Sequence, residues 1–304
     1  MRPKIGLALG SGAARGWSQI GIIESLAAFG IVPSIVCGTS IGALVGAAFA
    51  AGRLDALKSR IENFGRRDVA AMFDIKLASG GLIEGKRVEA LLETIGVTGS
   101  IEALKIKYGA VATDLATGRE IWFQAGPIGH AVRASIGMPG VFSPTEHTGG
   151  GWLIDGGLVN PVPVSLARAM GADIVIAVDL NSELVGRRFE GLTASAAAPE
   201  TSSRVPDWLH NALGPLLGRV LQGNRGHPSY FEVLANSLNI MQDRITRSRL
   251  AGDPPDVVLR PALGNFSWLD FHRAKDAIAE GSACANAAKD AIERACRNAM
   301  TGTA

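Results

Sequence analysis

A serine on a predicted strand-to-helix turn is the first residue here that could do covalent chemistry. Ser40 lies in the pentapeptide Gly38-Thr39-Ser40-Ile41-Gly42, which matches the pattern G-x-S-x-G. The apolar run 31–37 before it predicts a strand, and the small-residue run 43–51 predicts a helix. Glycines leave room for a strained backbone, and free N–H groups at the helix start favour developing negative charge. The pattern indicates a nucleophile that attacks an ester; an ordinary buried serine in a glycine-rich turn is the alternative.

A glycine-rich loop precedes the serine by one strand-helix unit. Gly10-Ser11-Gly12-Ala13-Ala14, followed by Arg15-Gly16, lies between the apolar run 4–10 and a predicted helix 17–29. Such a row of unhindered N–H groups suits an anion or an oxyanion. A dinucleotide fingerprint would require an acidic residue near the end of the second strand, and a Walker loop would require Gly-Lys-Ser/Thr. The loop therefore predicts an oxyanion hole beside Ser40, and a loop that merely closes helix against strand is the alternative.

The serine needs a base, and Asp155 is the carboxylate that the sequence favours. It ends the short apolar strand 152–154 and precedes Gly156-Gly157, so its carboxylate can approach another strand end without steric obstruction. Partial burial would raise its pKa towards the range useful for accepting the Ser40 proton. A turn-forming role is the alternative for Asp155, and Asp114 and Asp179 also end strands and are rival bases. The histidines have no recognisable motif around them; they are His130, His147, His210, His227 and His272.

The elements that must position these residues alternate as in an α/β fold. Two successive strand-helix units imply parallel strands, and 173–179 reads as another buried strand, so we expect a mostly parallel central sheet with helices on both faces. Segments 108–113 and 120–124 predict a hairpin, and 268–299 predicts a helix that breaks near Gly281. The uncharged stretch 31–52 is long enough for a transmembrane helix, but Pro33 and the glycines at 38 and 42 divide it.

Composition divides the chain into three parts. We expect a catalytic core over 4–180, an insert over 186–228, and C-terminal helices with one strand over 229–304 that complete the same domain. The Ala/Ser/Thr/Pro/Glu segment 193–203 predicts a mobile linker inside the insert. A broad apolar helical face over 208–221 suits a lid, a contact with a membrane interface, or a helix packed on the body or on a second subunit.

Overall composition narrows the class of partner. The chain has 304 residues, 47% hydrophobic residues and a formal charge of +2, which does not indicate nucleic-acid binding. Cys37, Cys284 and Cys296 have no metal-ligand spacing and fit a reducing compartment. The apolar run that ends at Leu9 is too short for a secretory signal. We therefore expect no metal, no cofactor and no signal peptide, and a cytoplasmic location with peripheral membrane contact at most.

At this point the residues resemble a known family. The loop ending in Arg15-Gly16, the serine turn 38–42 and Asp155-Gly156-Gly157, in this order, are similar to patatin-like phospholipases, particularly the bacterial patatin and neuropathy-target-esterase type. The resemblance spans about 4–180 and includes the segment 134–139 with Phe142 and the segment 112–115 with Gly118. It implies a three-layer fold, a Ser40–Asp155 dyad without histidine, and backbone N–H groups of Gly10 to Ala14 as the oxyanion hole. Ser11 and Ala13 stand where many members have glycine, which leaves the backbone N–H donors intact but narrows the space beside the acyl group.

Three functions are compatible with these residues. The first is hydrolysis of a lipid ester, as in a phospholipase A, a lysophospholipase or a lipid esterase, through an acyl-Ser40 intermediate that a water activated by Asp155 releases. The second is a non-catalytic regulatory protein that binds a nucleotide or an anion with the Gly10–Gly16 loop. The third is a hydrolase with a histidine triad. Headgroup, chain length and oligomeric state stay open.

Overall fold

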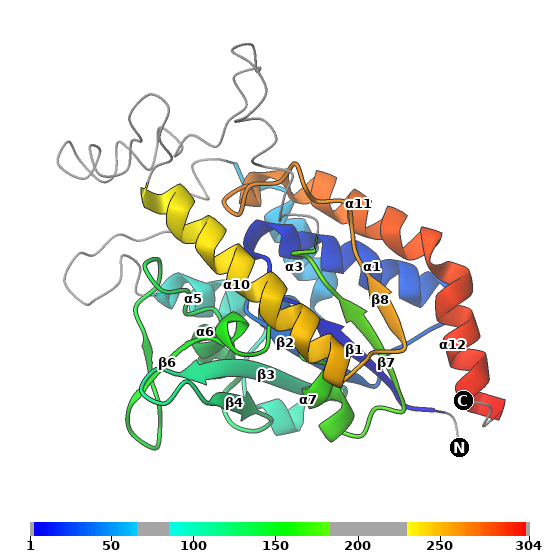
Figure 1. Ribbon diagram of the computed structural model, residues 1–304, viewed down its shortest axis with the longest axis horizontal. Coiled ribbons are helices and arrows are strands. Elements are labelled where there is room, and N and C mark those ends of the chain that lie inside the picture. Colours follow the sequence, from blue (N-terminus) through cyan, green and yellow to red (C-terminus); the bar gives the residue numbers. More distant parts are fainter. Residues whose placement is uncertain (1–2, 66–84, 183–229, 302–304) are drawn as a thin grey trace, which may run out of the picture.

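The computed structural model describes residues 3–65, 85–182 and 230–301. These residues form an eight-stranded sheet in the order β5-β6-β3-β2-β1-β7-β8, with β4 also paired to β3 (Figure 1). The strands are β1 Ile5–Leu9, β2 Ile35–Thr39, β3 Lys107–Asp114, β4 Glu120–Phe123, β5 Thr145–Glu146, β6 Trp152–Asp155, β7 Ile174–Val178 and β8 Val257–Leu259. Pairs β1–β2, β1–β7, β2–β3 and β7–β8 are parallel, whereas β4, β5 and β6 pair in antiparallel fashion. The sheet is therefore mostly parallel with an antiparallel end.

The register on β3 brings two strands end to end. Val111 pairs with Thr39 of β2 and with β4, so β2 and β4 lie on opposite sides of β3. The next residue, Ala112, pairs with β4 and with Asp155 of β6, so β6 lies on the same side as β2. The last residue of β6 therefore meets the last residue of β2, although the two are far apart in sequence.

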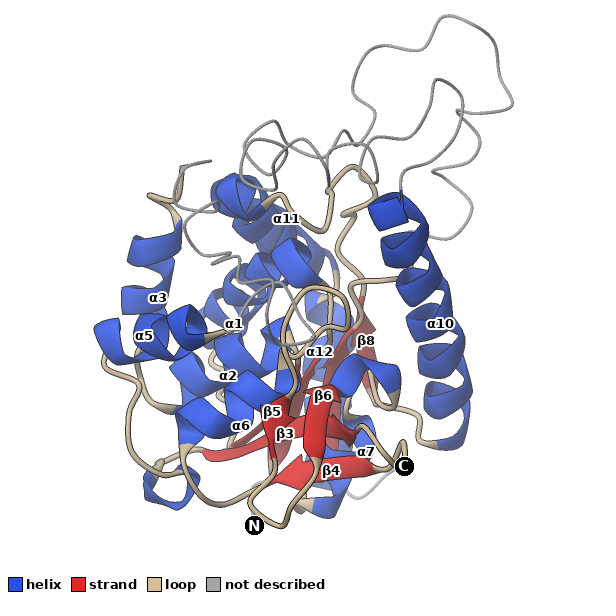
Figure 2. Cartoon of the chain, turned by 90° about the vertical axis from the view of Figure 1, so that its left-hand side faces the viewer, coloured by secondary structure: helices blue, strands red, loops and turns tan. Residues whose placement is uncertain are grey.

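Helices cover both faces of the sheet. Alternate side chains of β1 point to opposite faces: Leu7 and Leu9 join the core under α1 (Ser18–Ala28), α2 (Ile41–Ala50) and α11 (Ala274–Ala287), whereas Ala8 joins a second core with α7 (Val164–Ala169). Figure 2 shows α10 (Tyr230–Gly252) across the sheet from α1 and α2. The predicted three-layer α/β arrangement is confirmed.

The remaining helices complete these layers. They are α3 Leu54–Ile61, α5 Lys86–Thr94, α6 Ile128–Ser135, α12 Lys289–Thr301 and the short 3-10 helices η1 Ala13–Trp17, η2 Ile101–Ala103, η3 Gly156–Leu158 and η4 Phe271–Arg273. Within the described ranges, no helix is both long and apolar enough to cross a membrane. The uncharged stretch 31–52 is split as expected, because β2 and α2 occupy it.

Two expected element boundaries need correction, and one expected segment lies outside the described residues. The second strand begins at Ile35 and not at Ile31, because the Ile31 N–H still bonds to Leu26 at the end of α1. The C-terminal helix does not break at Gly281 but at Ala288, between α11 and α12. A Cβ on Gly281 would overlap the carbonyl oxygen of Ser18, so this glycine allows α11 to approach α1 closely. The predicted insert 186–228, with His210 and His227, lies outside the described residues.

Candidate functional site

Ser40 lies on a sharp and strained turn between β2 and α2. Its backbone has φ 57° and ψ −123°, a conformation that a residue with a side chain rarely adopts. A Cβ on Gly38 would overlap the carbonyl of Gly42, and a Cβ on Gly42 would overlap the carbonyl of Leu9. The Ser40 N–H donates to Ser135 Oγ of α6 at 2.8 Å. Both glycines of the G-x-S-x-G pattern are thus sterically required, and the side chain of Ser135 fixes the backbone between them.

Asp155 reaches Ser40 because β6 ends where β2 ends. Its Oδ2 accepts a hydrogen bond from Ser40 Oγ at 2.7 Å, and its Oδ1 accepts one from the N–H of Gly157 at 2.7 Å. Gly156 has to lack a side chain, because a Cβ there would overlap the carbonyl of Val111. Burial raises the pKa of Asp155 to about 6, while the hydrogen bonds from Ser40 and Gly157 act in the opposite direction. The arrangement holds a carboxylate of raised basicity against a serine hydroxyl.

The rival carboxylates serve other contacts. Asp114 accepts hydrogen bonds from the N–H and the hydroxyl of Thr117, which hold its pKa below the ordinary value, as expected of a hairpin turn. Asp179 accepts a hydrogen bond from the N–H of Asn181 and lies 3.5 Å from Arg260. Neither carboxyl group hydrogen-bonds to Ser40.

The histidines that the structure describes also lie outside the serine–aspartate pair. His130 is half-buried and stacks edge-on against Phe123, and Nδ1 of His147 accepts a hydrogen bond from the N–H of Gly149. Among the described residues, no histidine hydrogen-bonds to Ser40 or Asp155.

The glycine-rich loop keeps two backbone donors available. Three of its five N–H groups already donate to backbone carbonyls: Gly10 to Val178, Ser11 to Pro161 and Ala14 to Trp268. The N–H groups of Gly12 and Ala13 have no acceptor among the described residues. Ala13 has φ 51°, and only Ala13 and Ser40 have a positive φ among the non-glycine residues that the structure describes. The two strained residues line one and the same pocket.

Arg15 and Gly16 hold the glycine-rich loop in place through contacts with the loop itself, with Asn181 and with α2. The buried guanidinium of Arg15 donates from Nε to the carbonyl of Gly12 at 3.1 Å and from a terminal nitrogen to Asn181 Oδ1 at 3.1 Å. Gly16 allows η1 to contact α2, because a Cβ there would overlap the side chain of Ile41. Both residues fix the loop against the turn that carries Ser40.

An apolar pocket opens beside Ser40. It encloses about 620 Å³ of space, its open mouth included. Apart from Ser40, the described residues that line it are apolar or aromatic: Ala13, Trp17, Ile41, Leu44, Val88, Leu91, Ile136, Met138, Val141, Phe142, Trp268 and Phe271. Three of these residues, Ile136, Met138 and Phe142, belong to the segment that contributes to the family resemblance. A hydrocarbon chain fits such a lining, because it needs no polar partner.

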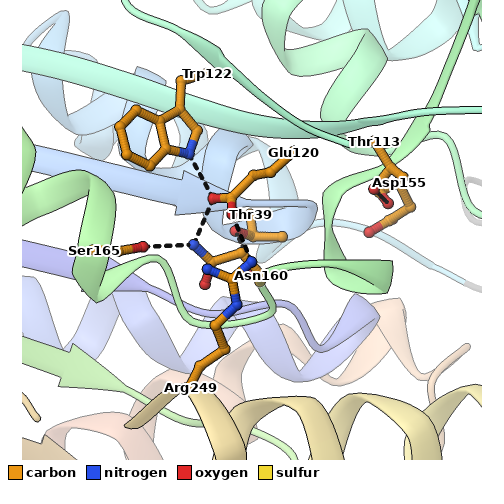
Figure 3. Close-up of polar contacts among 8 residues, drawn as sticks. All are labelled: Thr39, Thr113, Glu120, Trp122, Asp155, Asn160, Ser165 and Arg249. Atoms are coloured by element: carbon orange, nitrogen blue, oxygen red, sulfur yellow. Dashed lines mark hydrogen bonds and ion pairs between the residues drawn. The ribbon is translucent and has the colours of Figure 1, made fainter. Parts of the chain in front are cut away.

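Hydrogen bonds from further side chains hold these segments in place. Thr113 Oγ1 donates to the carbonyl of Asp155 at 2.8 Å, and Thr39 Oγ1 donates to the carbonyl of Asn160 at 2.8 Å (Figure 3). Gln242 of α10 accepts hydrogen bonds from Ser11 Oγ at 3.1 Å and from Asn181 Nδ2 at 3.0 Å. Thr113 and Ser135 belong to segments that resemble the family, but Gln242 lies in no motif. Its burial is a consequence of how α10 packs, which no local pattern reports.

The fold and the geometry define an α/β protein with a serine on a strained strand-to-helix turn, hydrogen-bonded to a buried aspartate. Residues 7–168 match the model of the patatin-like phospholipase family. A relative from Mycobacterium tuberculosis, described as an uncharacterized NTE family protein, is 32% identical over 335 residues, covering 96% of this chain and 92% of its own. The chain therefore belongs to the patatin-like phospholipase family, which relates it to lipid hydrolysis in general.

Two further similarities cover different shares of the chains. Patatin-like phospholipase domain-containing protein 7 of Rattus norvegicus is 35% identical over 184 residues, which is 59% of this chain and 14% of that protein. The crystal structure of VipD from Legionella pneumophila is similar with a TM-score of 0.44 and 13% identity, over 95% of this chain and 67% of that one.

Proposed function

We propose that this protein hydrolyses carboxylic esters of lipids with a Ser40–Asp155 dyad and no histidine. The observation that carries the proposal is the 2.7 Å hydrogen bond from Ser40 Oγ to Asp155 Oδ2 at the edge of an apolar pocket. The proposed class includes phospholipases A, lysophospholipases and lipid esterases.

The chemistry follows from these contacts. Ser40 Oγ attacks the ester carbonyl while its proton passes to Asp155 Oδ2, and the N–H groups of Gly12 and Ala13 stabilise the oxyanion. The alcohol leaves with the proton from Asp155, and an acyl ester on Ser40 remains. Asp155 then takes a proton from a water molecule that attacks the acyl ester, and it returns this proton to Ser40 Oγ as the acid leaves, which restores both residues. A pKa of about 6 suits this exchange at neutral pH, because Asp155 is ionised there and yet basic enough to take a proton.

The lipid nature of the substrate is supported by the pocket and by the family. Among the residues that the structure describes, an acyl chain that extends from Ser40 into the pocket would meet apolar side chains, so its burial contributes about 0.8 kcal/mol for each methylene group. Longer chains should therefore be hydrolysed with higher kcat/KM until the pocket is filled.

The structure offers less support for the two alternatives. A nucleotide or anion site on the glycine loop would use its N–H groups, but those of Gly10, Ser11 and Ala14 are occupied. A histidine triad would need an imidazole on Ser40, and the contact there comes from Asp155. The two alternatives predict, respectively, an unlabelled Ser40 and a variant at Asp155 that keeps much of its activity.

The experiment that tests the proposal is mass spectrometry after treatment with a fluorophosphonate probe. We expect the label on Ser40 in the wild type, no label in Ser40→Ala, and slowed labelling in Asp155→Asn. Asp114→Asn is the matched control, because it changes another strand-end carboxylate that does not contact Ser40, and should label like the wild type. A folded wild-type protein with an unlabelled Ser40 contradicts the proposal.

A further inference from the structure

One short segment contacts all three parts of the proposed site. The N–H of Asn160 donates to the carbonyl of Gly156 at 2.9 Å, and the carbonyl of Asn160 accepts from Thr39 Oγ1 at 2.8 Å. The carbonyl of the next residue, Pro161, accepts from the N–H of Ser11 at 2.8 Å. The three partners are the direct chain neighbours of Asp155, Ser40 and Gly12. The segment 160–161 therefore joins the aspartate turn, the serine turn and the glycine loop.

The side chain of Asn160 is held from outside this segment. Its Nδ2 donates to Glu120 Oε1 at 2.6 Å and to Ser165 Oγ at 3.0 Å (Figure 3). Glu120 in turn accepts from Arg249 of α10 at 2.7 Å and from the indole N–H of Trp122. Asn160 is 1% exposed and its hydrogen bonds to Glu120 and Ser165 are partly buried, and hydrogen bonds to a charged group are strong and specific in geometry.

We propose that Asn160 is a positioning residue that sets the distance between the serine, its base and the oxyanion donors, and that Glu120 anchors it. The proposal rests on the function proposed above. Asn160 touches no substrate; it acts through Thr39 and Gly156. A shift of about 1 Å in groups that must react lowers the rate by about 100-fold, so a loose Asn160 costs activity even when the protein stays folded.

A purely structural role would give a different signature. The hydrogen bonds from Ser40 and from the Gly157 N–H both lower the pKa of Asp155, and both depend on where the two turns stand. If Asn160 no longer holds the turns, these bonds lengthen and the pKa of Asp155 rises. The acid limb of the kcat/KM profile then moves to higher pH, whereas a mere loss of folded protein lowers activity at every pH alike.

The first test is Asn160→Leu, which keeps the approximate size of the side chain but removes both donors to Glu120 and Ser165. With a soluble p-nitrophenyl ester we expect kcat to fall about 10- to 100-fold, KM to change less than about twofold, and the acid limb to move up by about half a pH unit. Ile292→Ala in α12 is the stability control, because Ile292 is fully buried in the core where α12 packs on β7 and β8. It should lower the melting temperature without moving the limb. A limb that stays in place in Asn160→Leu overturns the proposal.

A second pair covers the case in which Asn160→Leu does not fold. Thr39→Val removes the hydroxyl that bonds to the Asn160 carbonyl, and Thr39→Ser restores it. We expect kcat to fall at least about tenfold in the valine variant and to stay within about threefold of the wild type in the serine variant. Equal rates in the two variants contradict the positioning role alone. A wild type without esterase activity or Ser40 labelling contradicts the proposed function, and this proposal with it.

Discussion

Asp155→Asn should stabilise the fold while it removes most of the activity. Burial raises the pKa of Asp155 from an ordinary value of 3.8 to about 6, so the folded state holds this proton more tightly than the unfolded state. The stability that this preference contributes is complete below the unfolded pKa and is lost as the pH rises through about 6. Asparagine keeps the shape and carries no charge, so it avoids this loss at neutral pH.

The magnitude follows from the difference between the two pKa values. About two pKa units correspond to about 3 kcal/mol between the limiting states at low and high pH, of which about 2 kcal/mol develops between pH 4.5 and pH 7.5. Urea unfolding of wild type and Asp155→Asn at both pH values measures it. The advantage of the variant over the wild type should be larger by about 2 kcal/mol at pH 7.5. This comparison does not depend on the hydrogen bonds that asparagine itself makes, since those are the same at both pH values. Activity should fall by about 10²- to 10⁴-fold, as expected for loss of a general base.

Asp114→Asn is the control with the opposite sign. Hydrogen bonds from Thr117 lower the pKa of Asp114, so the stability that its ionised form contributes is present above its unfolded pKa and is lost as the pH falls. Relative to the wild type, Asp114→Asn should therefore be less stable by about the same amount at pH 4.5 and at pH 7.5, because both values lie above the ordinary pKa of 3.8, and it should keep its esterase activity. An advantage of Asp155→Asn that is the same at both pH values, or smaller at pH 7.5, refutes the account of Asp155 as a carboxyl group destabilised by burial.

Three further outcomes follow from the same contacts. The kcat/KM of the wild type should fall about tenfold per pH unit below a midpoint near 6, where Asp155 becomes protonated; a midpoint at or below about 4.5 contradicts the assignment. Ser135→Ala leaves the buried N–H of Ser40 without its acceptor, so the free energy of unfolding in urea should fall by about 1–3 kcal/mol and fluorophosphonate labelling should slow. An unchanged free energy of unfolding contradicts this role of Ser135. Gly42→Ala places a methyl group against a carbonyl of β1 and should cost about 3 kcal/mol or more in unfolding experiments. In the control Gly129→Ala in α6, the new methyl group meets only one atom, at 3.8 Å, so this variant should be neutral or slightly stabilising. Similar losses of stability in both variants contradict the steric argument.

The sequence predicts the fold and the serine turn because both depend on local patterns. The strand-helix units follow from apolar periodicity, and Ser40 follows from the glycines beside it. Gly281 shows the limit of such reasoning, since a glycine within a helix reads as a break until the helix α1 that it contacts is known.

The contact between Ser40 and Asp155 depends on something non-local. It arises because β2 and β6 pair with successive residues on the same side of β3. The sequence favours Asp155 over Asp114 and Asp179 only through the two glycines that follow it, and it does not show which strand end lies beside Ser40. The anchors Glu120, Asn160 and Gln242 are invisible in the sequence for the same reason. Polar residues outside any motif become important for the structure only when tertiary packing buries them and leaves them a single set of hydrogen-bond partners.

The features that lower the stability of this fold are concentrated at the proposed site. Ser40 and Ala13 have strained backbones, Asp155 is a carboxyl group almost without exposure to water, and Gly12 and Ala13 keep N–H groups without acceptors among the described residues. The strained backbones and the buried carboxyl group each cost about 1–3 kcal/mol, and a sequence selected for stability alone would have removed them. They persist together around one apolar pocket, where a strained turn carries the serine, burial makes the aspartate basic, and two backbone N–H groups remain available to donate to a negative oxygen. Their coincidence therefore supports a site preorganised for acyl transfer, in which burial gives Asp155 the basicity that a histidine supplies in a triad.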